Sequence, residues 1–60
     1  MTRAEMLDRL VWADANIVQA RAALDAGDEW VASCWAAAGA ANLRSIADAV
    51  PVPPERGGPV

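Results

Sequence analysis

The fold of this chain is decided by residues 30–50, which read WVASCWAAAGAANLRSIADAV. The stretch is rich in alanine, the strongest helix former, and it predicts a helix over residues 29–50. Pro51 ends this helix, because proline lacks a backbone donor and disfavours helical geometry in the residue before it. We expect one face to pack on a partner helix. Its members are Val31, Trp35, Ala38, Asn42, Ile46 and Ala49, with Leu43 and Val50 at its edge.

The same helix carries small side chains at every fourth position, where a neighbouring backbone can approach closely. These residues are Ser33, Ala37, Ala41 and Ser45. Cys34 lies among the alanines. We expect it to be buried as a small apolar residue, because the chain has no histidine to activate its thiol.

A partner helix is predicted before this one, over residues 3–26. Thr2 and Glu5 have the spacing of a capping box, which marks a helix start. Apolar residues then follow in alternating steps of four and three, as in a coiled-coil seam. The predicted seam consists of Met6, Leu10, Ala13, Ile17, Ala20 and Leu24, and Leu7, Val11 and Val18 widen it.

Residues 26–28 form the predicted turn. Gly27 can close the first helix in a left-handed conformation, and Asp28 is a good N-cap for the second. So short a connection makes the helices antiparallel neighbours. The sequence therefore predicts an all-α antiparallel two-helix hairpin over residues 1–50, within a helical bundle or larger assembly.

Residues 51–60, PVPPERGGPV, predict an extended arm, because prolines and glycines exclude a helix. The arm matches a short PxxPx[Arg] pattern of the kind that aromatic grooves bind, but a stiff arm lying along a neighbour is the simpler interpretation. On either interpretation its candidate partner-binding residues are Pro51, Pro53, Pro54 and Arg56.

Composition argues against several functions. The net charge of −3 and five scattered arginines argue against nucleic-acid binding. The apolar run ends before Arg44, too short to cross a membrane, and residues 1–6 do not resemble a signal peptide. We therefore expect a cytoplasmic protein, or one internal to a cytosolic assembly.

No catalytic, metal or cofactor site is expected. The chain has no histidine and no tyrosine, and a single cysteine cannot close an intrachain disulfide. Asp25, Asp28 and Glu29 cluster at the turn, where capping explains them better than a metal does. An enzyme is therefore the weakest of the functional hypotheses.

The length makes a protein partner the central expectation, because a chain of about 60 residues buries only about 60% of the surface that its unfolded form exposes. Candidate contact residues are Trp12 and Trp30, since tryptophan is common among interface anchors. Asn42 either fixes the register of a buried interface or faces water. We expect a homo-oligomer or a subunit of a larger complex. The first hypothesis is a structural subunit that acts through helix packing, with the arm tethering a neighbour. The alternative is a small acidic regulator that folds onto another protein and masks a site.

Overall fold

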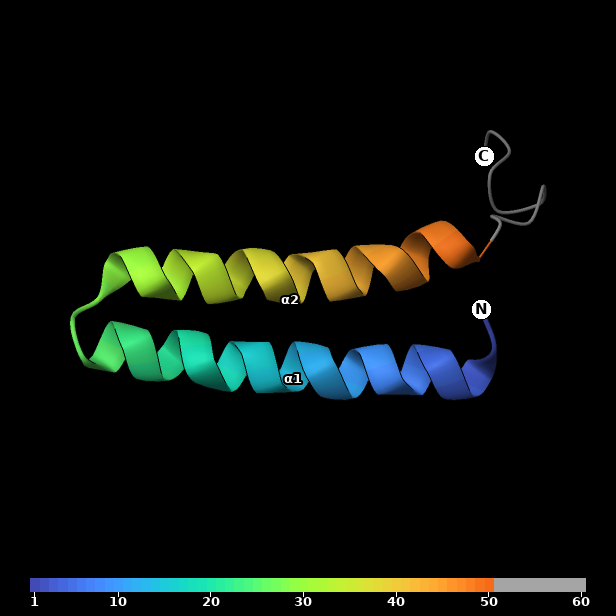
Figure 1. Cartoon of the computed structure of the whole chain (residues 1–60), viewed down its shortest axis with the longest axis horizontal. Helices are drawn as coiled ribbons and strands as arrows, with labels where there is room; N and C mark the ends of the chain where they lie inside the picture. The colour runs from blue at the N-terminus through green and yellow to red at the C-terminus, as the bar shows by residue number, and fades with distance from the viewer. Residues whose placement is uncertain (51–60) are drawn as a thin grey trace, which may run out of the picture.

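The computed structural model describes residues 1–50 of the chain. It contains two α-helices, α1 over Arg3–Asp25 and α2 over Glu29–Ala49, which run antiparallel as a hairpin (Figure 1). The predicted all-α hairpin is therefore confirmed, and each helix ends one residue earlier than expected. Val50 adopts an extended conformation, as the residue before a proline should.

Helix α1 begins at the predicted capping box. The Thr2 hydroxyl accepts a hydrogen bond from the Glu5 amide at 3.1 Å, and the Thr2 amide donates to Glu5 Oε1 at 2.8 Å. Two backbone donors that the helix itself leaves unpaired are thereby satisfied.

The turn closes through Gly27, which has φ of +80°. The Gly27 amide donates to the Leu24 carbonyl at 3.0 Å, and the Asp28 amide donates to the Ala23 carbonyl at 2.8 Å. This pair of bonds is a Schellman motif, which requires a left-handed backbone conformation at the position that Gly27 occupies. Asp28 then caps α2, because its Oδ1 accepts from the Val31 amide at 3.1 Å.

The seam between the helices is built from small and polar residues. Ala13, Asn16 and Ala32 are 2–6% exposed, and Gly39 is also buried. A Cβ placed on Gly39 would lie 3.4 Å from Asn16 Cβ, so the two backbones approach closely at this point. The half-buried residues around this core are Met6, Ala20, Ala23, Ala38, Asn42, Ser45 and Ile46.

The predicted seam of α1 is therefore half wrong. Met6, Ala13 and Ala20 do face α2. Leu10, Ile17 and Leu24 do not, because α1 is rotated so that residues one position earlier, including Asn16 and Ala23, face α2 instead. Small side chains and a hydrogen-bonded asparagine allow the close approach that bulky residues would prevent. Leu7, Val11 and Val18, which were expected to widen the seam, are exposed as well.

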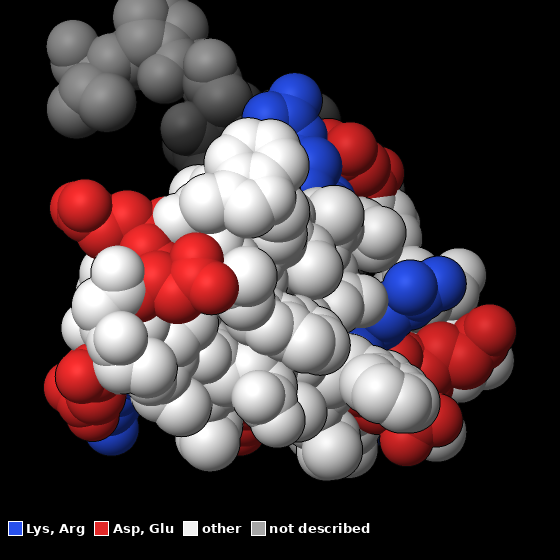
Figure 2. All heavy atoms as spheres, turned by 60° about the vertical axis from the view of Figure 1, so that its left-hand side comes forward, with Lys and Arg blue, Asp and Glu red and all other residues white. Residues whose placement is uncertain are grey.

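The predicted face of α2 is also correct for three of its six residues. Ala38, Asn42 and Ile46 are half-buried, whereas Val31, Trp35 and Ala49 are exposed. The sequence pattern missed Ala32 and Gly39, the two most deeply buried residues of this helix. Seen obliquely from the side of the turn, residues other than Lys, Arg, Asp and Glu form a continuous central area with charged residues toward its edges (Figure 2).

Candidate protein-interaction surface

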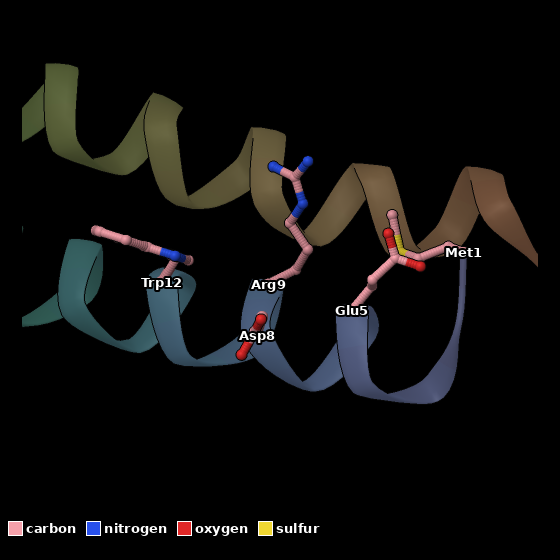
Figure 3. Close-up of a pocket in the computed structure, with 5 residues that line it drawn as sticks. All are labelled: Met1, Glu5, Asp8, Arg9 and Trp12. Carbon is pink, nitrogen blue, oxygen red and sulfur yellow. The ribbon is translucent and has the colours of Figure 1, made fainter.

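Trp12 lines an open hollow on the N-terminal half of α1 (Figure 3). The ring is available for contact, since the residue is 64% exposed. Figure 3 shows Arg9 extending toward α2, whereas Asp8 points the other way. The remaining lining residues are Met1 and Glu5. A large exposed ring beside groups of both charges can serve as an interface anchor.

The carboxyl group of Glu5 is the titratable group at the edge of this hollow whose pKa is shifted. Hydrogen bonds from the Thr2 backbone and, second, the Thr2 side chain lower its pKa below the usual 4.5. They do so because a carboxylate that accepts hydrogen bonds is favoured in its charged form. Glu5 therefore carries a negative charge at neutral pH at the end of the hollow away from Trp12 (Figure 3).

Trp30 lies in the first turn of α2 and is 77% exposed. The hairpin places Trp30 level with the end of α1. That end lies about 13 residues after Trp12, so the two tryptophans are roughly 20 Å apart along the helix axis. The two tryptophans predicted to bind a partner therefore belong to separate parts of the surface.

Asn42 lies in the seam and hydrogen-bonds within the hairpin. Its Nδ2 donates to Asn16 Oδ1 at 2.9 Å and to the Ala38 carbonyl at 3.3 Å. Arg9 Nη1 donates to Asn42 Oδ1 at 3.3 Å. No buried side-chain nitrogen or oxygen within residues 1–50 lacks a hydrogen-bond partner. Of the two interpretations of Asn42, its position matches that of a residue that fixes the register of a helical interface.

Sequence reasoning missed the two side-chain partners of Asn42. Asn16 and Arg9 repeat at a seven-residue spacing together with Ala23, one position before the expected large residues. This spacing could have indicated that these residues face α2. It was passed over because Leu10, Ile17 and Leu24 have the same spacing, and large apolar residues are the usual members of a seam.

Those three displaced residues form a line along α1, which we call the outer stripe: Leu10, Ile17 and Leu24. Each is between 42% and 58% exposed. Leu24 lines a second hollow together with Ala36, which places this flank of α1 beside the Ala36 flank of α2. Leu43, seven residues after Ala36, continues that flank and is also exposed. The hairpin thus presents large apolar side chains on a flank that its own packing leaves uncovered.

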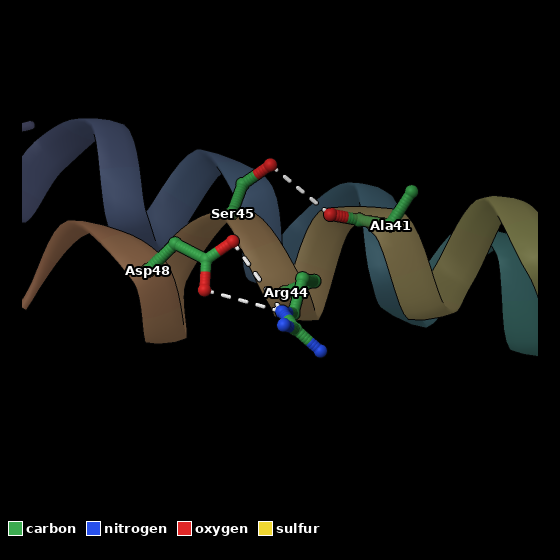
Figure 4. Close-up of polar contacts among 4 residues, drawn as sticks. All are labelled: Ala41, Arg44, Ser45 and Asp48. Atoms are coloured by element: carbon green, nitrogen blue, oxygen red, sulfur yellow. Dashed lines mark hydrogen bonds and ion pairs between the residues drawn. The ribbon is translucent and has the colours of Figure 1, made fainter.

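Helix α2 carries polar contacts that are internal to it (Figure 4). Arg44 Nε lies 3.1 Å from Asp48 Oδ1, and both side chains are exposed. The Ser45 hydroxyl donates to the Ala41 carbonyl at 3.0 Å. An exposed pair of this kind contributes little to stability. These contacts do not join the two helices.

Cys34 is exposed, so the expectation that it is buried was wrong. Its position explains this. Cys34 follows the buried Ala32 by two residues, and side chains two apart on a helix point to nearly opposite sides. The thiol therefore faces away from α1.

Four of the predicted partner-binding residues lie outside the described residues: Pro51, Pro53, Pro54 and Arg56. Within residues 1–50, no group of three or more histidine, cysteine, aspartate or glutamate residues is placed to hold a metal ion. Neither described helix has the length and hydropathy needed to cross a membrane.

Taken together, the described surface offers three separate candidate contacts: the Trp12 hollow, the exposed Trp30 ring and the outer stripe. Comparisons of the chain with protein-family models, with curated proteins and with solved structures gave no match.

Proposed function

We propose that this chain is a non-enzymatic structural or assembly subunit that acts through helix–helix packing. In this proposal the faces of α1 and α2 that the hairpin leaves open are covered by other protein chains. The C-terminal arm then tethers a neighbouring chain. The protein is proposed to be located in the cytoplasm, or inside a cytosolic assembly.

One observation carries this proposal. The apolar residues buried within the described hairpin are alanines, Ala13 and Ala32, whereas its leucines, valines and tryptophans are exposed. Full burial of a leucine or valine side chain contributes about 1.5–3 kcal/mol, so a hairpin that leaves these residues partly in water does not gain that stabilisation in full. Contact with another chain supplies that burial.

The first test measures the mass and the helicity of the full chain over a wide range of concentrations. Sedimentation equilibrium should show a defined oligomer, and helicity should fall as dilution dissociates it. A monomer that keeps its helicity and melts cooperatively at every concentration would contradict the proposal.

Trp12→Ala tests whether the Trp12 hollow belongs to the assembly. We expect it to reduce the average mass of the assembly while helicity is retained, because Trp12 makes no hydrogen bond to α2 and its ring is exposed. The matched control is Val11→Ala, which shortens an exposed apolar side chain of the same helix outside the candidate contacts. Unchanged association would remove Trp12 from the interface.

Deletion of residues 51–60 tests the tether. The support for this part is the proline-rich sequence alone. We expect the deletion to weaken assembly and, at concentrations where the chain stays assembled, to leave the helicity of the hairpin unchanged. The regulator hypothesis predicts a different result in the first test: a monomer that is poorly folded alone and gains helicity only with its target. Trp12→Ala should weaken association under either hypothesis.

A further inference from the structure

The outer stripe has a symmetry that bears on what covers it. Leu10 and Leu24 lie seven residues before and after Ile17. A second α1 packed antiparallel, with a two-fold axis at Ile17, would therefore place Leu10 opposite Leu24 of the other copy. Ile17 would then face itself. An isologous contact of this kind needs a self-complementary surface, and the stripe provides one.

The charges beside the stripe fit the same axis. Asp14 and Arg21 each follow a stripe residue by four positions, so both lie on the stripe's side of α1. They are almost equally distant from Ile17, so each faces the opposite charge on the other copy. Two symmetric ion pairs result. The ion pair within the described residues involves Arg44 and Asp48, so Asp14 and Arg21 remain available.

The second helix is complementary about this axis as well. Because Gly39 contacts Asn16, Ile17 lies level with about residues 38–40 of α2. An axis at that level places Leu43 of one copy opposite the small side chains of Ser33 and Ala36 of the other. A large side chain facing small ones is the arrangement that fills a helical interface without voids.

The size of the flank is also sufficient. A helix of the length of α1 is about 34 Å long, and two helices side by side are roughly 20 Å wide, which gives about 700 Å² per copy. Standard stable interfaces bury about 600–1,000 Å² per partner, so the area of this flank lies within their range. The opposite flank suits a second copy less well, because the hollow there is lined by two carboxylates, Glu5 and Asp8, whereas the hollow beside Leu24 is lined by one, Glu29.

We infer that a second copy of this chain covers the outer stripe, forming a two-fold antiparallel four-helix bundle with its axis at Ile17. The inference rests on the proposed function, and it adds the partner and the surface. The Trp12 hollow lies on the other flank and stays open in this dimer, so a further neighbour can use it.

The first experiment compares two adjacent aspartate substitutions in the full chain. Ile17→Asp places two carboxylates at the axis and should raise the dimer dissociation constant by about 100-fold or more. Val18→Asp is the control, since Val18 is more exposed than Ile17 and its side chain is turned by about 100° from that of Ile17 around the helix. Its dissociation constant should stay close to that of the unchanged chain.

The second experiment tests the axis directly by disulfide formation under mild oxidation. Cys34→Ser first removes the native thiol. Ile17→Cys in that background should give a disulfide-linked dimer, because a two-fold axis brings the two positions within bonding distance. Val11→Cys in the same background, on the outer face, should give little.

The outcomes separate the inference from the proposed function. An oligomer that Ile17→Asp leaves intact, or one that cross-links no better through position 17 than through position 11, overturns the inference and leaves the assembly role standing. A chain that is monomeric at every concentration overturns the inference as well. If that monomer is also stably folded, the proposed function fails with it.

Discussion

The hairpin seam and the outer stripe divide the residues of α1 in an unexpected way. The seam contains Ala13 and Asn16, with Gly39 facing them from α2. The stripe contains Leu10, Ile17 and Leu24, which are larger and apolar, yet these are the residues left exposed. A hairpin stabilised by its own burial would show the reverse arrangement.

The difference indicates that the two surfaces have separate roles. The seam brings the two backbones close and fixes their register through the Asn16–Asn42 hydrogen bond. It buries little apolar area, so it contributes specificity more than stability. The stripe offers the apolar area. On the proposals above, the seam sets the relative position of the two helices, and contacts of the outer stripe with another chain supply most of the stability.

The largest effect is expected from breaking the seam at Gly39. Gly39→Leu places a bulky side chain where a single Cβ would already lie 3.4 Å from Asn16, so the helices must separate. We expect a destabilisation at or above about 3 kcal/mol, the upper end for overpacking. Urea denaturation at one fixed protein concentration measures it. Ala37→Leu, at an exposed position of the same helix, is the control. Equal stability of the two variants would contradict a tight seam.

The polar pair of the seam should give the next largest effect. Asn42→Ala leaves the buried Asn16 amide without its partner, at a cost of between about 1 and 3 kcal/mol. Adding Asn16→Ala removes the stranded group, so the double variant should lose less than the sum of the single losses. The same denaturation series measures all three variants. Strictly additive losses would show that the hydrogen bond does not couple the helices.

The sequence was sufficient to predict the two helices and the residues that cap them, because capping depends on residues close together in the chain. Thr2, Glu5, Gly27 and Asp28 act as their residue types and spacing predict. The rotation of α1 was not predictable in the same way. Two stripes with seven-residue spacing compete on this helix, and the choice between them depends on how closely the other helix can approach.

The candidate site was predictable only in part for the same reason. Trp12 and Trp30 are exposed. The outer stripe and Asn16 could be assigned only after the helices had been placed against each other. Cys34 was misassigned because alanine-rich surroundings in the sequence do not show which side of a helix a residue occupies.

A smaller effect is expected at the turn, which belongs to neither surface. Gly27→Ala forces a side chain into a left-handed conformation, and we expect a loss of about 1–2 kcal/mol. No atom lies within 4 Å of the added Cβ, so the loss comes from the backbone alone. Thermal melts measure both variants, and Gly27→Asn should recover part of the loss because asparagine tolerates this conformation better. Equal losses for Ala and Asn would point to a cause other than backbone geometry.

The smallest effect is expected from pH at the start of α1. The hydrogen bonds from Thr2 hold the pKa of Glu5 below its usual 4.5 in the folded chain, so the charged carboxylate favours folding. This contribution is fully present above pH 4.5 and is lost as the pH falls through the lowered pKa. Thermal melts of the unchanged chain and of Glu5→Gln should therefore differ at neutral pH and converge in acid. Thr2→Ala, which removes the hydroxyl that Glu5 contacts, should narrow the difference.

The difference between the unchanged chain and Glu5→Gln should also persist in the Ile17→Asp background, because the capping box lies outside both surfaces. If it vanished there, the end of α1 would be coupled to the outer stripe, and the separation between the two surfaces would not hold.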